Sequence, residues 1–287
     1  MKKWMQCLLA VGLVLNGASA MAACSPIPGA EQAWSKPALR WVFVGELHGS
    51  NETPEEFLNL VCDALARGRQ VTVALERPTS EQAALDGILN ATDSPAATRR
   101  LLSEPGWVNG MDGRASEAML RLLIALRALR RSYPDLAVAA FDAPYSGNAP
   151  GARDEVMGHA LLAVGSAAPK NLILVLTGNI HAMQAPVFGY DLAAMFLPAG
   201  QRLSLEVTDR GGESWTDNVG GCGAWKGGIR DKDITRPRGI FFDPSLAPYG
   251  KVDGILSLGV PLTASAPAAG EPSPLPACRI KFLQQKH

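Results

Sequence analysis

The sequence has no excess of charge of either sign. It contains 27 Lys and Arg residues against 27 Asp and Glu residues among 287 positions. Nucleic-acid binders normally carry a basic excess, so this balance argues against that class of partner. Aromatic residues make up 6% and charged residues 19% of the chain, whereas hydrophobic residues make up 47%. A chain this apolar can bury enough surface to offset its conformational entropy, which excludes intrinsic disorder.

Several familiar catalytic and binding motifs are also missing. The chain has no G-x-S-x-G nucleophile elbow, no H-E-x-x-H pair, no P-loop and no G-x-G-x-x-G after a predicted strand. These absences disfavour serine hydrolases, zincins and nucleotide-binding proteins. No cysteine pair has zinc-ribbon or C-x-x-C spacing. What remains is chemistry carried by histidines and carboxylates.

The N-terminus has the features of an export signal. A short positive start precedes an apolar stretch that ends in Ala18-Ser19-Ala20, the small-x-small pattern of a signal peptidase site. The stretch is shorter than the ~20 residues that a spanning helix needs. We therefore predict a signal peptide over residues 1–20 and a periplasmic or secreted protein without a transmembrane segment after cleavage. A lipoprotein anchored at Cys24 is the alternative.

Cleavage changes the charge and the cysteine count. Removal of Lys2, Lys3 and Cys7 leaves a net charge of −2 and four cysteines. An even number in an exported chain suggests disulfides, although sequence alone cannot choose among the pairings. We favour Cys222 with Cys278, because both lie in a Gly/Pro-rich part of the chain where a cross-link would stabilise most. Free buried thiols are the alternative.

Apolar runs alternate with helical patterns along most of the chain. Strands are predicted at 41–44, 71–75, 136–141, 172–176 and 203–207, and helices at 53–67, from about 79 or 80, at 116–131 and at 153–164. This alternation predicts an α/β fold with a mostly parallel β-sheet flanked by helices. We expect an irregular lead-in at 21–40 and a single α/β domain at 41–287. Its core is 41–208, and the loop-rich section 209–287 is expected to hold short strands near 254–258 and 279–282.

The residues at the predicted strand ends are not ordinary loop residues. In an open parallel sheet, ligands bind beyond the carboxyl ends of the strands. Those ends carry Gly45-Glu46-Leu47-His48, Glu76, Asp142 and Gly178-Asn179-Ile180-His181. Each glycine is expected to let the backbone turn sharply off its strand, so that the histidine three residues later points back over the sheet edge.

A histidine at a strand end is often a structural residue when it stands alone. The joint placement of several charged groups at one edge is costly unless they are paired or bind a ligand. We therefore interpret the edge as a functional site. Glu206, within the fifth run, and His159, within a helix, are interpreted as structural.

These residues resemble a known superfamily. Gly45-Glu46-Leu47-His48-Gly49 is similar to the G-E-x-H or G-E-x-x-H-G motif of the group that contains erythromycin esterases, ChaN-like haem-binding proteins and Tiki/TraB proteins. Ala74-Leu75-Glu76 resembles its second-strand glutamate, Arg153 to Gly158 its R-D-x-x-M helix, and Gly178-Asn179-Ile180-His181 its later G-x-x-H. The resemblance covers roughly 41–184. One departure is that the esterase branch has an extra threonine before the first histidine.

The resemblance implies one of three functions, because the branches of this superfamily differ in what they do. In the esterase branch, the positions matched by His48 and Glu76 activate water for ester hydrolysis. In the Tiki branch the matched glutamate and histidine positions are implicated in metal-dependent peptide cleavage. The ChaN branch binds haem.

Our first hypothesis is therefore an exported hydrolase of a small-molecule or peptide substrate. His48 would serve as the general base, Glu76 or Glu46 would orient its imidazole, and His181 with Asn179 would steady the oxyanion. Asp142 belongs to the same candidate set. A variant places a divalent metal between His48, His181 and Glu76.

The second hypothesis is a periplasmic binding protein for haem or a metal ion, without turnover. His48 or His181 would then be the ligand. The strand-end loops offer a haem few aromatic residues beyond Trp107, Tyr145, Phe188 and Tyr190.

Overall fold

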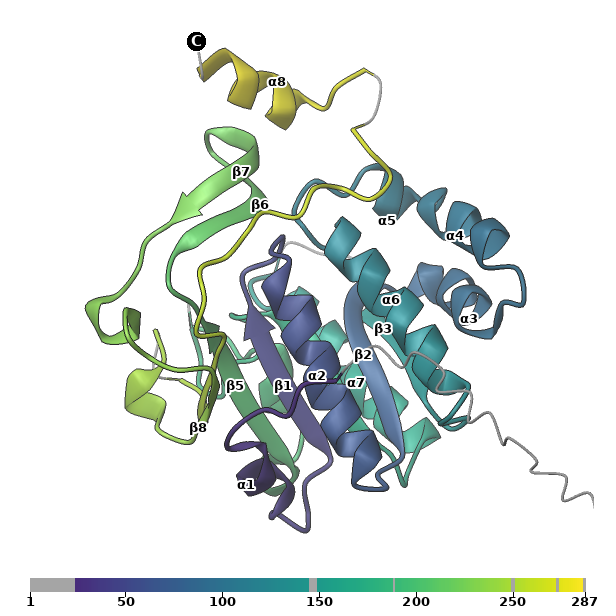
Figure 1. Ribbon diagram of the computed structural model, residues 1–287, viewed down its shortest axis with the longest axis vertical. Coiled ribbons are helices and arrows are strands. Elements are labelled where there is room, and N and C mark those ends of the chain that lie inside the picture. The colour runs from purple at the N-terminus through teal and green to yellow at the C-terminus, as the bar shows by residue number, and fades with distance from the viewer. Residues whose placement is uncertain (1–23, 145–148, 188, 249–250, 272–273, 286–287) are drawn as a thin grey trace, which may run out of the picture.

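A central sheet of seven strands organises the protein (Figure 1). The computed structural model describes residues 24–144, 149–187, 189–248, 251–271 and 274–285, so the predicted signal peptide lies outside the described residues. The strand order is β3-β2-β4-β1-β5-β9-β8. All neighbouring pairs are parallel except β8 with β9. The strands are β1 (Trp41–Glu46), β2 (Val71–Pro78), β3 (Ala137–Asp142), β4 (Leu172–Gly178), β5 (Arg202–Thr208), β8 (Gly239–Phe241) and β9 (Gly254–Ser257).

Helices cover both faces of this sheet, and α2 and α6 lie on the face toward the viewer in Figure 1. The helices are α1 (Ala30–Trp34), α2 (Glu52–Ala66), α3 (Gln82–Asn90), α4 (Ser94–Leu102), α5 (Pro105–Val108), α6 (Glu117–Arg130), α7 (Ala152–Ala167) and α8 (Ala277–Gln285). Short 3-10 turns occupy Thr79–Glu81, Ala193–Phe196, Ala199–Gln201, Asp231–Asp233 and Pro244–Leu246. The predicted α/β class with a mostly parallel sheet is confirmed.

Two hydrophobic cores explain why the strands read as continuous apolar runs. Val42 and Val44 of β1 pack into the core that contains α2 and α6. Trp41 and Phe43, which point to the opposite face, pack into the core that contains α7. Since successive residues of a strand alternate between faces, a sheet that is covered on both sides needs apolar residues at every position.

The C-terminal section adds a two-stranded antiparallel hairpin, β6 (Gly212–Asn218) with β7 (Gly221–Gly227), outside the main sheet. The predicted strand near 254–258 is present as β9. The predicted strand at 279–282 is wrong, because these residues lie in helix α8. The edge strands of the main sheet are β3 and β8. The segment instead satisfies its backbone hydrogen bonds within helix α8, which a disulfide ties to β7 outside the main sheet.

The lead-in predicted as irregular contains helix α1. Its residues Ala30 and Ala33 are buried, and the indole of Trp34 donates a hydrogen bond to Asp63 of α2. Burial of this short helix against α2 supplies the stability that five residues lack by themselves.

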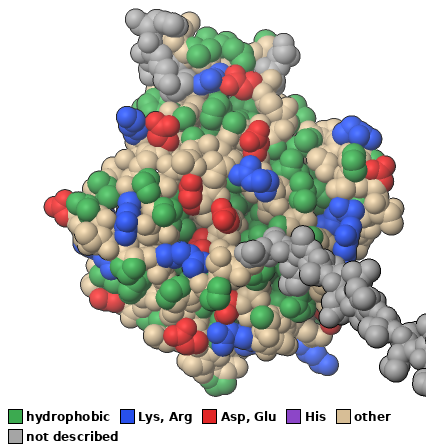
Figure 2. All heavy atoms as spheres, in the orientation of Figure 1, with side chains coloured by type: hydrophobic (Ala, Val, Ile, Leu, Met, Phe, Trp, Pro, Cys, Tyr) green, Lys and Arg blue, Asp and Glu red, His purple; other side chains and the backbone are tan. Residues whose placement is uncertain are grey.

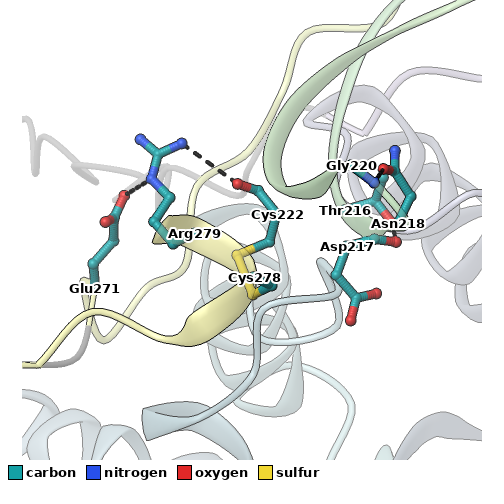
Figure 3. Close-up of a disulfide and its surroundings, with 8 residues drawn as sticks. All are labelled: Thr216, Asp217, Asn218, Gly220, Cys222, Glu271, Cys278 and Arg279. Atoms are coloured by element: carbon teal, nitrogen blue, oxygen red, sulfur yellow. Dashed lines mark hydrogen bonds and ion pairs between the residues drawn. A yellow bond between two sulfur atoms is a disulfide. The ribbon is translucent and has the colours of Figure 1, made fainter. Parts of the chain in front are cut away.

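Two disulfides cross-link the described residues. Cys24 is bonded to Cys62 of α2, and Cys222 of β7 to Cys278 of α8 (Figure 3). The second is the pairing favoured from the sequence. The first engages Cys24, the residue that would carry the lipid in the lipoprotein alternative. Disulfides persist in oxidising compartments, so both are consistent with an extracytoplasmic protein. In the described part of the chain, no helix has the length and apolar character needed to cross a bilayer.

Candidate active site

Three adjacent strands deliver the central residues of the site. Glu46 ends β1, Glu76 lies near the end of β2, and Gly178 ends β4, which runs between them. Glu46 and Gly178 are direct partners in the sheet register. Since all three strands are parallel, their carboxyl ends meet at one edge, as the sequence predicts.

The imidazole of His48 lies between two buried carboxylates. Its Nδ1 is 3.0 Å from Glu46 Oε1, and its Nε2 is 3.5 Å from Glu76 Oε2. The His48 side chain is 19% exposed, whereas both glutamates are buried. Burial alone would lower the pKa of His48, but the charge of Glu76, the hydrogen bonds with both glutamates and the charge of Glu46 raise it to about 10. At neutral pH the imidazole therefore holds a proton on each nitrogen.

The two glutamates differ in their proton affinity. Burial raises the pKa of Glu46, and the hydrogen bond and charge of His48 offset only part of that rise. Burial also acts on Glu76, but the charge and hydrogen bond of His48 and the charge of Arg114 outweigh it and hold the pKa of Glu76 well below its usual value. Glu76 Oε2 also accepts from Thr177 Oγ1 and from the Gly178 backbone N–H, both at 2.7 Å. Glu76 is thus a fixed anion.

Two arginines complete the charge network. Arg153 Nη2 lies 2.8 Å and Arg114 Nη1 3.1 Å from Glu76 Oε1. Asp142 holds both guanidinium groups, accepting from Arg114 at 2.9 Å and from Arg153 at 2.8 and 3.1 Å. Asp112 binds the other edge of Arg114 at 2.8 Å through Nε. The network places two positive groups beside Glu76, the carboxylate that faces His48 Nε2.

His181 is held by neighbours at both ring nitrogens. Its Nδ1 is 2.6 Å from Asp154 Oδ1, and its Nε2 is 2.9 Å from Arg153 Nη1. Because a guanidinium group only donates, Nε2 accepts and the ring proton lies on Nδ1, which donates to Asp154. Asp154 also accepts from the backbone N–H of Ala193 at 3.0 Å. In this arrangement His181 positions Arg153.

The two strand-end glycines are needed for space, not for the sharp turn expected from the sequence. Neither has a positive φ, and both lie within their strands. A Cβ at Gly178 would come within 3.2 Å of His48 Nε2 and 3.5 Å of Glu76 Oε2. A Cβ at Gly45 would come within 2.9 Å of the Asn179 Cα. The absence of a side chain therefore leaves room for the imidazole at Gly178 and for the segment after β4 at Gly45.

These groups open into a cavity of about 460 Å³, which we call the reaction cavity. The β6–β7 hairpin contributes Ser214, Thr216, Asp217, Trp225, Lys226 and Gly227 to its lining. The hairpin is joined to the loop after His48, because Trp215 N–H donates to the Gly49 carbonyl at 2.9 Å. Leu47, Ile180 and Trp225 give the cavity an apolar wall. A substrate there would contact both the charged network and apolar side chains.

The structure brings five predicted site residues to this cavity, and they are Glu46, His48, Glu76, Asn179 and His181. Asp142 lies behind them and binds both arginines. Sequence reasoning did not assign Arg114, Asp112, Arg153 or Asp154 to the site. Arg153 and Asp154 could have been found from the sequence, because they begin the R-D-x-x-M pattern. Arg114 and Asp112 lie in a loop between α5 and α6, where no sequence pattern indicates a functional residue.

The residues present do not fit a metal ion or a haem iron. In the predicted ligand sets either would be bound through His48 or His181, and would need a free lone pair on an imidazole nitrogen. At neutral pH both His48 nitrogens hold protons toward the two carboxylates, and the His181 nitrogens face Asp154 and Arg153. Within the described ranges, no group of three or more His, Cys, Asp or Glu side chains is arranged to hold a metal. The positive charge beside Glu76 comes from arginines instead.

Comparisons with known proteins identify the fold. A scan against protein-family models and a search of curated proteins each gave no match. Among solved structures, a mutant of the erythromycin esterase EreC in its open conformation matches with a TM-score of 0.59 and 12% identity, over 80% of this chain and 92% of the esterase. A succinoglycan biosynthesis protein matches with a TM-score of 0.61 and 9% identity, over 82% and 91% of the two chains.

A protein from Bacillus cereus matches with a TM-score of 0.56 and 10% identity, over 83% of this chain and 92% of its own. At these identities the likeness concerns the fold. The resemblance to the erythromycin esterase group, inferred from four short motifs, is confirmed at that level.

Proposed function

We propose that this chain is an extracytoplasmic hydrolase that cleaves an ester bond in the reaction cavity. The observation that carries the proposal is the His48 imidazole, which is held between two carboxylates beside two arginines in an open cavity. Imidazole is the side chain best suited to move protons during ester hydrolysis. The fold shared with an erythromycin esterase supports the same reaction class.

His48 is the proposed general base. In its neutral form it takes a proton from a water molecule, and the water oxygen attacks the ester carbonyl carbon. Arg114 and Arg153 stabilise the negative charge that develops on the carbonyl oxygen, because preorganised donors act most strongly in a site shielded from water. The ester C–O bond then breaks, and His48 returns the proton to the leaving alcohol. Water and ester give one acid and one alcohol.

The resting charge state of His48 sets a condition on this mechanism. With a pKa of about 10, the imidazole must lose a proton before it can act as a base. Activity should therefore rise with pH through the neutral range and level off near pH 10. Glu76 keeps its charge throughout and orients the ring. In this proposal His181 acts through Arg153 and not on the oxyanion directly, because its Nε2 already accepts from that arginine.

A panel of short-chain alkyl and aryl esters, followed by pH-stat titration of the released acid, tests the proposal. We expect hydrolysis by residues 21–287 and a loss of about 10²- to 10⁴-fold in kcat/KM for His48→Asn, the usual contribution of a general base. The matched control is His159→Asn, which changes an exposed histidine of α7 outside the site. Absence of hydrolysis across the panel, or full activity of the His48 variant, would overturn the proposal.

A further inference from the structure

A second cavity adjoins the reaction cavity at the carboxyl end of β5. This β5 cavity has a volume of about 200 Å³ and shares Glu46, Leu47 and Asn179 with the reaction cavity. Thr208, the last residue of β5, and Asp209 also line it. A molecule bound at His48 could therefore extend past Glu46 into this second space.

Four buried polar atoms on residues that line the β5 cavity have no hydrogen-bond partner among the described residues. Two are oxygen atoms, Glu46 Oε2 and Thr208 Oγ1, on residues that are 4% and 3% exposed. Two are nitrogen atoms, Nη1 and Nη2 of Arg230. An unsatisfied buried group of this kind is costly, so four in one cavity point to a ligand that satisfies them.

The other charged groups of the β5 cavity do not meet this need. Asp233 is engaged by Arg230 Nε and by Arg236. Asp209 accepts from the Gly211 backbone N–H at 2.7 Å, and burial raises its pKa. Glu206 is buried beside them.

The unpartnered atoms define the chemistry of the ligand. A cation or an ammonium group would satisfy Glu46 and Thr208 but would be repelled by Arg230. A carboxylate or phosphate would satisfy Arg230 but would be repelled by Glu46. A hydroxyl group both donates and accepts, so neighbouring hydroxyls can bind the carboxylate and the guanidinium together.

We propose that the β5 cavity binds a hydroxyl-rich group of the substrate, of the kind presented by a sugar ring. The inference rests on the proposed function and gives it a substrate class, the acylated carbohydrates. Water would add to the acyl carbon at His48, the bond from that carbon to the sugar oxygen would break, and the sugar would leave as an alcohol with the returned proton. The apolar wall of Leu47, Ile180 and Trp225 would face the acyl group.

A matched pair of esters tests the substrate class. Methyl 6-O-acetyl-glucopyranoside and cyclohexylmethyl acetate are both acetates of a primary alcohol on a six-membered ring, but only the first carries ring hydroxyls. We expect kcat/KM to be at least about tenfold higher for the sugar ester, the worth of one or two hydrogen bonds. A ratio near one in the wild-type protein would overturn the proposal.

Two variants of β5 locate the effect. Thr208→Val keeps the shape of the side chain and removes its hydroxyl, so the selectivity ratio should fall by about two- to tenfold, the worth of one hydrogen bond. Ser204→Ala is the matched control. Ser204 Oγ is also buried without a partner among the described residues, but it lies on β5 away from the cavity. An equal effect of both variants would contradict the assignment.

A binding measurement separates this inference from the hydrolase proposal. Methyl glucoside, galactoside and mannoside contain no ester, and we expect at least one to give saturable heat in calorimetry that weakens in Thr208→Val and not in Ser204→Ala. Binding without ester hydrolysis would refute the hydrolase and leave the sugar site. Hydrolysis without glycoside binding would refute the sugar site. Binding of the cation tetramethylammonium instead of a glycoside would refute it as well.

Discussion

Replacing Glu46 by Gln removes one of the two carboxylates that hold the His48 imidazole. The substitution keeps the size of the side chain and leaves Glu76 and both arginines in place. The negative charge of Glu46 stabilises the imidazolium, so its removal should lower the pKa of His48. The same substitution should shift the alkaline rise of hydrolysis to lower pH, since that rise follows deprotonation of His48.

The structure sets the size of this shift. Glu46 Oε1 lies 3.0 Å from His48 Nδ1, within direct hydrogen-bond distance. An opposite charge this close moves a pKa by about 1 to 3 units. Starting from about 10, the His48 pKa in Glu46→Gln should lie between about 7 and 9. Glu76→Gln should lower it at least as far, because the charge of Glu76 is the largest of the effects that raise it.

Imidazole titration by NMR with labelled histidine measures these values without a substrate. Spectra recorded from about pH 5 to pH 11 bracket the ordinary histidine pKa and the raised one, and His48→Asn assigns the signal. Glu155→Gln is the control, because it removes the same charge from an exposed position of α7. A His48 pKa near 6.5 in the wild-type protein, or one that Glu46→Gln leaves unchanged, would refute the reasoning.

Three further predictions concern the same region. Gly178→Ala places a methyl group about 3.2 Å from His48 Nε2 and should lower kcat/KM at least about tenfold while circular dichroism shows an intact fold. Replacing Cys222 and Cys278 together by Ser removes a cross-link that spans 56 residues and should lower the unfolding free energy in urea by about 4 kcal/mol. The folded-state pKa of His48 is raised, so protonated His48 contributes its full stabilisation below about pH 6.5. This contribution decreases as the pH rises from there to about 10. Over that range the wild-type unfolding free energy should fall relative to His48→Asn by about 1.4 kcal/mol per pH unit, and a parallel pH dependence of the two proteins would contradict the pKa.

The sheet was predictable because its strands are buried on both faces. Runs such as Leu172 to Leu176 are apolar at every position, so each strand is visible in the sequence without knowledge of its neighbours. Parallel strands then place their carboxyl ends together, and for this reason the sequence predicts Glu46, His48 and Glu76 in one site. The prediction needed only local patterns and one topological rule.

The β6–β7 hairpin was not predictable in this way. Only Trp215 of β6 is buried, so the strand has no apolar alternation. Its position depends on long-range contacts, such as the hydrogen bonds of Trp215 with Gly49 and of Glu213 with Leu262. Arg114 was missed for a similar reason. Its loop packs at Gly113 against the backbone of His48 and Gly49, a contact between distant parts of the chain.

The strand order explains why this edge can hold an imidazole between two glutamates. Glu46 and Glu76 come from β1 and β2, which are separated by β4 and therefore lie two strand spacings apart, about 9.5 Å. Any side chain at the end of β4 would fill the space between them. Because β4 ends in Gly178, the space stays open, and His48 enters it from the loop after β1. The G-x-x-H repeat at the ends of β1 and β4 thus has two different uses. His48 fills the gap above Gly178, whereas His181 lies beside this gap, contacts Asp154 and positions Arg153.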